Sequence, residues 1–235
     1  MKDVFGKALR DYHNNNYTED IITSTSISEE DTLPLPYLFR TYKDMPKLEQ
    51  KALDLAKGSV LDVGCGSGSH ALYLQKKGLT VKGIDISEGA IFVAKARGLE
   101  HVEMVSILAE TETFDTILIL MNGTGIFQTL NQVSQHLKHL KSLLNPNGQI
   151  LIDSSDIQYM YEDDDGGIWM DTNADYYGEL DYYISYKGES EDPMKWLYLD
   201  FDRLKLACET VGLECEKVMD GEHFDYLARI VAPHH

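Results

Sequence analysis

A short apolar strand that runs into three alternating glycines constrains this chain more than any other feature. Residues 60–68 read VLDVGCGSG, and the β-branched and leucine side chains before the first glycine favour a buried strand. Glycines leave the turn without Cβ atoms, so a ligand can approach its backbone closely. Apolar residues at helical spacing follow, and a second strand at 80–84 ends at Asp85. The pattern predicts a strand-helix-strand unit with a ligand site at the glycine turn.

Two carboxylates near this turn indicate which ligand it takes. Asp85, at the tip of the second strand, can accept hydrogen bonds from a ribose diol lying over the glycines. Asp62 lies inside the first strand, where a carboxylate opposes a dinucleotide pyrophosphate but suits the cationic amino group of an amino acid. A dinucleotide site would read GxGxxG, whereas this turn reads DxGxGxG. The motif resembles motif I of the class I (Rossmann-like) S-adenosylmethionine-dependent methyltransferases, and Asp85 resembles their acidic ribose-binding residue.

The resemblance implies S-adenosylmethionine as the cofactor and a set of residues that contact it. Around the first two strand ends, these are Asp62, Gly64, Gly66, Gly68, Asp85 and Ile86. Members of the family frame the adenine with residues after the third strand. That position holds Ile107 and Leu108 here, and a role in the hydrophobic core fits these two equally well. Ser106 stands before them where Asp is commoner in the family, which weakens the match at the adenine.

Further contacts are implied at the fourth strand and before the core domain. Met121 and Asn122 follow the fourth strand at the carboxyl edge of the sheet, where open α/β folds bind ligands. Arg40 is a candidate partner for the methionine carboxylate, because some family members place a basic residue just before the core. A solvated surface position is the simpler interpretation of a lone Arg.

The order of elements predicts an α/β fold. Helices are expected at 46–57, 68–77, 87–97, 130–144 and 204–211, and strands at 60–63, 80–84, 102–105, 114–121, 149–153, 213–219 and 224–232. Alternating buried strands and helices favour a parallel sheet covered on both faces. The prediction is therefore a doubly wound, seven-stranded, mostly parallel sheet with a C-terminal antiparallel hairpin. The link between the third and fourth strands is too short for the helix that the family usually places there.

The domain organisation follows from the same pattern. Residues 1–45 are predicted to form an irregular or helical cap, and 46–235 the methyltransferase domain. Within it, 154–201 is an acidic, aromatic-rich insertion expected to cover the substrate, since it holds eight of the fourteen tyrosines and both tryptophans. Aromatic rings beside carboxylates suit a cationic amine. The alternation at 182–185 is also that of an ordinary strand, so both interpretations stay open.

The amino-acid composition limits which partners and which compartment the protein is expected to have. The net charge of −18 disfavours nucleic acid and anionic membranes, because binding to both relies on Lys and Arg. The sequence contains no run of 18 apolar residues and opens on no signal-peptide pattern, which predicts a cytoplasmic protein. Its three cysteines form no C-x-x-C pair, so no metal site is expected. The oligomeric state stays open.

These observations predict a methyltransferase acting on a small molecule, with transfer to O, N or C undecided. If the acceptor must lose a proton early, the candidate bases after the fifth strand are Asp153, Asp156 and Tyr159. One alternative is a protein that binds S-adenosylmethionine without turnover, as a sensor or partner subunit. Another is a nicotinamide-dependent oxidoreductase, against which both the glycine spacing and Asp62 count.

Overall fold

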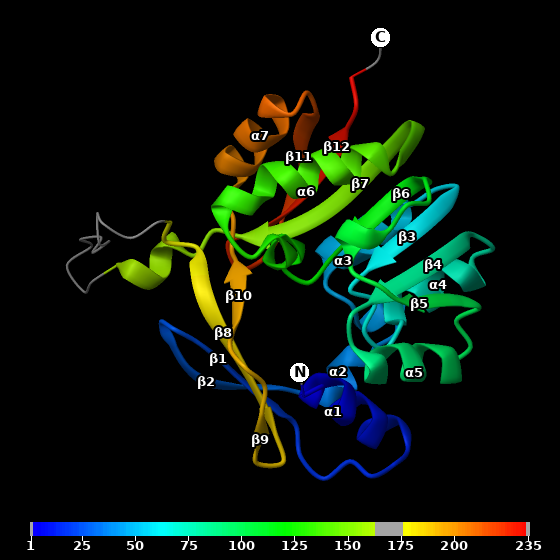
Figure 1. Cartoon of the computed structure of the whole chain (residues 1–235), viewed down its shortest axis with the longest axis vertical. Coiled ribbons are helices and arrows are strands. Elements are labelled where there is room, and N and C mark those ends of the chain that lie inside the picture. The colour runs from blue at the N-terminus through cyan, green and yellow to red at the C-terminus, as the bar shows by residue number, and fades with distance from the viewer. Residues whose placement is uncertain (1, 163–175, 234–235) are drawn as a thin grey trace.

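A seven-stranded sheet forms the centre of the molecule (Figure 1). The computed structural model describes residues 2–162 and 176–233. The strand order is β11-β12-β7-β6-β3-β4-β5. The strands are β3 (Ser59–Val63), β4 (Thr80–Asp85), β5 (His101–Met104), β6 (Phe114–Ile119), β7 (Leu144–Ser155), β11 (Glu214–Asp220) and β12 (Asp225–Val231). β3 to β7 pair in parallel, whereas β12 pairs antiparallel with β7 and β11 with β12. The predicted fold class is confirmed.

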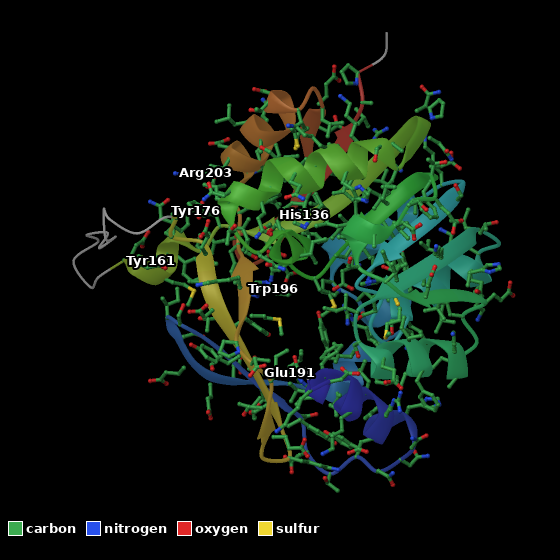
Figure 2. The ribbon with its side chains drawn as sticks, in the orientation of Figure 1. His136, Tyr161, Tyr176, Glu191, Trp196 and Arg203 are labelled. Carbon is green, nitrogen blue, oxygen red and sulfur yellow. The ribbon has the colours of Figure 1, made fainter. Side chains whose placement is uncertain are left out.

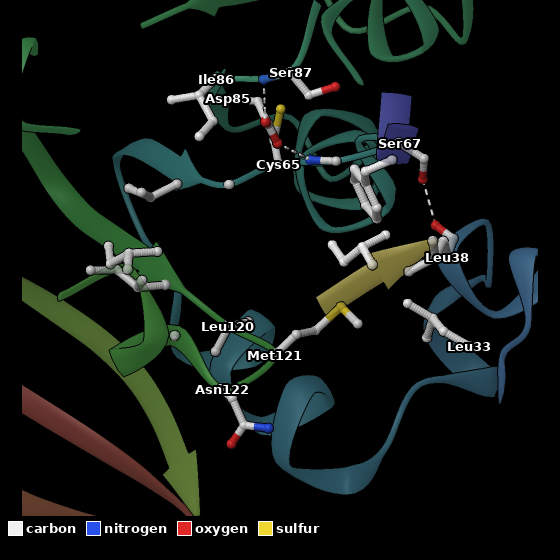
Figure 3. A pocket seen from close by; sticks show the side chains of 18 of the residues that line it. Leu33, Leu38, Cys65, Ser67, Asp85, Ile86, Ser87, Leu120, Met121 and Asn122 are labelled. Atoms are coloured by element: carbon white, nitrogen blue, oxygen red, sulfur yellow. Dashed lines mark hydrogen bonds between the residues drawn. The ribbon is translucent and has the colours of Figure 1, made fainter. Parts of the chain in front are cut away.

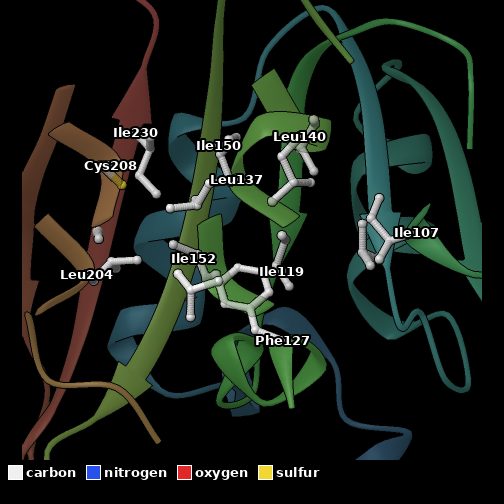
Figure 4. Packing of buried hydrophobic residues seen from close by; sticks show 14 of the residues in the cluster. Ile107, Ile119, Phe127, Leu137, Leu140, Ile150, Ile152, Leu204, Cys208 and Ile230 are labelled. Carbon is white, nitrogen blue, oxygen red and sulfur yellow. The ribbon is translucent and has the colours of Figure 1, made fainter. Parts of the chain in front are cut away.

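Helices cover both faces of this sheet. They are α3 (Lys47–Leu55), α4 (Ser69–Lys76), α5 (Glu88–Ala96), α6 (Leu130–Ser142) and α7 (Phe201–Thr210). Successive residues of a strand point to opposite faces, so Ile150 and Ile152 of β7 pack against α6 and α7 (Figure 4), while Leu151 packs with residues of α3 and α4. Between β5 and β6 there is only a 3₁₀ turn, Ile107–Ala109, as the short link predicts.

The N-terminal residues form a helix and a hairpin, more regular than the irregular or helical cap expected. They comprise α1 (Val4–His13), β1 (Ile21–Thr25), β2 (Ser28–Leu33) and α2 (Leu35–Leu38). β1 pairs antiparallel with β8 (Glu179–Tyr186), which in turn pairs with β9 (Glu189–Ser190) and β10 (Met194–Leu197). Strands from two of the predicted segments, the N-terminal 1–45 and the insertion 154–201, therefore form a single second sheet. Trp169 and most of the acidic run beginning at 162 lie outside the described residues.

Helix α1 packs closely on α5. Asp3 is the N-cap of α1, where its Oδ1 accepts the Gly6 N–H at 2.9 Å, and its Oδ2 accepts the Gly89 N–H of α5 at 2.8 Å. A Cβ on Gly89 would lie 2.4 Å from the Gly6 backbone, so the two glycines permit the contact. The N-terminal helix is therefore docked beside the end of β4, where Asp85 lies.

The described residues contain no helix able to span a membrane and no cluster of potential metal ligands. Within residues 2–162 and 176–233, the helices are all too short or too polar to cross a membrane. The same part of the chain holds no group of three or more His, Cys, Asp or Glu side chains placed to bind a metal ion.

Candidate active site

One cavity of about 400 Å³ lies at the carboxyl ends of β3, β4 and β6 (Figure 3). The main sheet contributes the glycine turn and the residues after β4 and β6. The opposite wall comes from α1, β2, β8 and β10, so both sheets enclose the same space. Of the predicted cofactor residues, those that line it are Arg40, Asp62, Gly64, Gly66, Asp85, Ile86, Met121 and Asn122.

The glycine turn forms a backbone cradle. Gly64, Gly66 and Gly68 have φ of +68°, +54° and +84°, which side chains rarely adopt. A Cβ on Gly64 would meet no protein atom within 4 Å, so it would project into the cavity space that a ligand needs. Gly68 does not line the cavity; it is the N-cap of α4, and its Cβ would lie 3.3 Å from Ala94 of α5. Gly68 therefore serves helix packing, whereas Gly64 and Gly66 face the ligand space.

Asp85 is held at the cavity by the backbone around it. Its Oδ2 accepts the Gly66 N–H and its Oδ1 accepts the Ser87 N–H, both at 2.9 Å. Each oxygen retains acceptor capacity, as a diol partner requires. Burial raises the pKa of this carboxyl group. Beside it, the Ile86 side chain is 73% exposed and offers an apolar surface at the rim.

Asp62 lies deeper in the same cavity. It is 2% exposed, and its Oδ2 accepts the Ala71 N–H from the first turn of α4 at 3.1 Å. Burial raises the pKa of Asp62 to about 6, so the carboxyl is mostly ionised at neutral pH. An anionic group at this depth favours a cationic ligand group beside it.

Arg40 belongs to a buried charge cluster that the sequence did not reveal. Its guanidinium donates to both Glu49 oxygens at 2.5 Å and stacks on the Tyr37 ring at 3.9 Å. His70 Nε2 lies 2.8 Å from Glu49 Oε2. Burial opposes ionisation of Glu49, yet hydrogen bonds and charge from His70 and Arg40 lower its pKa. Arg40 and His70 both line the cavity. The contact of Arg40 with the methionine carboxylate stays a prediction.

Met121 and Asn122 form a strained turn after β6. Both have left-handed backbone conformations, with φ of +70° and +56°, which cost energy in residues with side chains. The carboxylate of Asp153, buried under the turn, accepts the Met121 N–H at 3.2 Å and the Gly123 N–H at 2.9 Å. Asn122 Oδ1 accepts the Ser155 hydroxyl at 2.9 Å, which orients its amide. Strand β7 thereby holds the turn at the cavity wall.

Besides Gly68, five predicted residues do not line the cavity. Ile107 packs in the hydrophobic core beside α6, which agrees with the interpretation of this residue as a core residue. Leu108 does not fit that interpretation, because it is 41% exposed. Asp153 supports the strained turn from beneath. Asp156 accepts the Tyr177 hydroxyl, and Tyr159 stacks on an exposed Phe224 ring. Their catalytic assignment stays a prediction, and their positions offer it no support.

The wall opposite the predicted cofactor residues was anticipated only in part, through the aromatic segment 154–201 that was expected to cover the substrate. It holds Lys2, Asp3, Phe5, Leu33, Tyr182, Ile184, Glu191, Met194 and Trp196. Figure 2 shows Trp196 on β10 and Glu191 before that strand. Only the aromatic enrichment of 154–201 pointed toward this wall. No local signal marked the N-terminal residues, because their place depends on pairing between β1 and β8.

Comparison with known proteins identifies the fold's family. A methyltransferase domain family matches residues 37–218. The chain belongs to the class I S-adenosylmethionine-dependent methyltransferase family. A SAM-dependent methyltransferase from Bacteroides fragilis, solved in complex with S-adenosyl-L-homocysteine, is 42% identical, with a TM-score of 0.92 over 98% of this chain and 95% of that chain. The predicted family is confirmed, and S-adenosylmethionine is its cofactor.

More distant relatives agree with this family. A methyltransferase of Geobacillus sp. (strain WCH70) is 30% identical over 114 residues, which make up 46% of this chain and 46% of that protein. The match spans less than half the length of the first two curated relatives of this chain. The CcbJ methyltransferase from Streptomyces caelestis is 16% identical, covers 80% of this chain and 90% of that chain with a TM-score of 0.63, and shows the same fold.

Proposed function

We propose that this methyltransferase moves the methyl group of S-adenosylmethionine to a small-molecule acceptor bound in the same cavity. The observation that carries the proposal is the continuity of that cavity. It joins the glycine turn and Asp85 on one side to the aromatic wall of β8 and β10 on the other. A cofactor on the first side would present its reactive end to a molecule on the second.

The residues fit the cofactor in three places. Asp85 retains acceptor capacity for the ribose diol, and the glycine turn leaves room for the ligand at Gly64. Asp62 is a buried carboxylate suited to the amino group of the methionine part. Arg40, held by Glu49 beside the cavity, is the proposed partner of the methionine carboxylate.

The chemistry requires position more than reactive side chains. The bound cofactor would supply a methyl group on a sulfonium, whose carbon is open to in-line attack by a nucleophile with S-adenosylhomocysteine as the leaving group. Holding two reactants in the right geometry can supply about 7–11 kcal/mol of the barrier. Here α1 and the second sheet enclose the reactants, and the turn at Met121 and Asn122 is held rigidly by Asp153. These elements would orient the acceptor and exclude water from the methyl group.

The alternatives lack a specific observation in their favour. A nicotinamide dinucleotide would have to place its pyrophosphate at the glycine turn, beside the Asp62 carboxylate. A binding protein without turnover needs no acceptor wall, whereas this cavity continues onto one.

Calorimetry tests the cofactor side directly. S-adenosylhomocysteine should bind to the purified chain and NADH should not. Adenosine and 2′,3′-dideoxyadenosine then test Asp85, because only adenosine carries the ribose diol. The wild type should prefer adenosine, and Asp85→Asn should lose most of that preference. If the dideoxy analogue binds as well as adenosine in the wild type, the ribose assignment is wrong; if S-adenosylhomocysteine does not bind, the proposed function is wrong.

A further inference from the structure

The acceptor side of the cavity is apolar and aromatic. Trp196 packs over Gly125 so closely that a Cβ there would lie 2.0 Å from the indole, and its ring centroid is 5.3 Å from that of Tyr182. Ile184 and Met194 extend the same wall. Walls of this kind bind the body of a small molecule by burying its apolar surface and stacking on its rings.

Glu191 supplies a carboxylate to this wall. It lies in the turn between β9 and β10 and lines the cavity. Its Oε1 accepts the Phe5 N–H at 2.9 Å, at the N-terminus of α1. Among the described residues no hydrogen bond to its Oε2 is found. The contact with Phe5 therefore fixes the side chain and leaves one oxygen for a ligand.

The charge of the cavity favours a cation. Its lining includes the carboxylates Asp3, Asp62, Asp85 and Glu191, and the cations Lys2 and Arg40. The charge of Arg40 is already balanced by Glu49. Asp3, Asp62 and Asp85 are each engaged with backbone N–H groups on the main-sheet side. Asp3 and Glu191 both lie on the wall opposite Asp62 and Asp85, but both oxygens of Asp3 accept hydrogen bonds, whereas Glu191 keeps one oxygen for a ligand.

We propose that the acceptor is a small amine carried on an apolar, ring-bearing body, and that Glu191 determines this specificity. The inference rests on the proposed function. The body would lie against Trp196 and Tyr182, and the nitrogen would face Glu191. A carboxylate and aromatic faces both attract an ammonium group, whereas a carboxylate or phosphate on the acceptor would be repelled.

The methyl-transfer step balances without another reactant. The bound ammonium first loses a proton to water, which leaves a neutral amine with a lone pair. That lone pair forms the N–C bond to the methyl carbon as the S–C bond breaks, and the electron pair of the S–C bond stays on sulfur in S-adenosylhomocysteine. The product nitrogen carries the positive charge as an N-methylammonium ion, and the one proton released is that lost in the first step. Glu191 orients the nitrogen and takes no part in bond making.

Three probes with one body test the proposal. They are 2-phenylethylamine, 2-phenylethanol and 3-phenylpropionate, titrated into the full chain saturated with S-adenosylhomocysteine. The same series with an indole body is tryptamine, tryptophol and indole-3-propionate. In at least one series the amine should bind at least tenfold more tightly than the alcohol, and the carboxylate should bind most weakly. If the amine does not bind, or binds no better than the alcohol, the proposal is overturned.

Glu191→Gln isolates the charge. Glutamine keeps an oxygen that can accept the Phe5 N–H, so the wall should keep its shape. Amine affinity should fall at least tenfold while affinity for the alcohol stays within twofold. Glu189→Gln is the control, because Glu189 pairs with Lys7 outside the cavity. If amine affinity is unchanged in Glu191→Gln, Glu191 only anchors α1. Every variant is first shown to bind S-adenosylhomocysteine to saturation. A variant that binds S-adenosylhomocysteine but shows no loss of amine affinity contradicts the role of Glu191, whereas loss of S-adenosylhomocysteine binding in the wild type would contradict the proposed function.

Discussion

Asp3 Oδ2 accepts the backbone N–H of Gly89 at 2.8 Å, across 86 positions of the sequence. The other oxygen of Asp3 accepts the Gly6 N–H and the Ser87 hydroxyl. One side chain therefore caps α1 and also binds the beginning of α5, which follows the Asp85 end of β4. This contact places the N-terminal helix at the cavity, where Lys2 and Phe5 form part of the wall.

Asp3→Ala should destabilise the fold and weaken ligand binding. Loss of an N-cap costs about 1–2 kcal/mol, and here two helix beginnings lose an acceptor. We expect a lower melting temperature in thermal unfolding and weaker S-adenosylhomocysteine binding, because Ser87 and α1 both border the cavity. Asp192→Ala, at an exposed position, is the matched control. An unchanged melting temperature in Asp3→Ala would show that the contact contributes little.

Gly89→Ala should disrupt the packing of α1 on α5. The added methyl would lie 2.4 Å from the Gly6 backbone, which cannot move aside as a flexible side chain can. Overpacking of this kind costs about 1–3 kcal/mol, even though Ala favours a helix more than Gly does. Chemical denaturation should show this loss, while Lys95→Ala on the exposed side of α5 should stay within about 0.5 kcal/mol. A stabilised Gly89→Ala variant would contradict the close helix contact.

Gly64→Ala should weaken cofactor binding beyond what its cost to folding explains. Gly64 and Gly78 both have positive φ, and a Cβ at either position meets no protein atom within 4 Å. Only Gly64 lines the cavity. Gly64→Ala and Gly78→Ala should therefore lose similar stability, whereas calorimetry should show weakened S-adenosylhomocysteine binding in Gly64→Ala alone. Equal affinities in the two variants would place the ligand elsewhere.

Asp153 should make stability depend on pH. Burial raises its pKa to about 6, so between pH 4 and 6 the folded protein binds a proton that the unfolded chain has released. The free energy of unfolding should therefore fall as pH rises through this window, by about 3 kcal/mol from this group. Asp153→Asn removes that titration, and the fall should be correspondingly smaller in urea denaturation at pH 4, 5, 6 and 7. An unchanged pH profile would show that Asp153 is not the group responsible.

Local patterns were sufficient for the main sheet and for one half of the site. The strands around residues 60–63 and 80–84 are apolar, and three glycines mark the turn, so Asp62 and Asp85 could be placed at neighbouring strand ends. The helix expected at 87–97 begins at Ser87, whose hydroxyl accepts the Ala90 N–H at 3.0 Å. Each of these features depends on residues close together in the chain.

The second sheet could not be predicted in the same way. β2 reads SEEDTL and is mostly exposed, so it lacks the alternation that identifies a strand. Its neighbour β1 pairs with β8, with Ile22 opposite Ser185, and nothing local specifies a partner so distant. The cluster of Arg40, Glu49 and His70 was missed for the same reason, since it joins α3 and α4 to the segment before them.

Local sequence specifies the glycine turn, the carboxylates at two strand ends and the family to which they belong. These features follow from short-range steric rules and strand periodicity, which act within a few residues. Which residues form the cavity wall opposite Asp62 and Asp85 depends on tertiary contacts. Glu191, Trp196 and α1 reach that wall only because long-range strand pairing and the Asp3 contact hold them there, and burial makes those contacts favourable only in the folded chain.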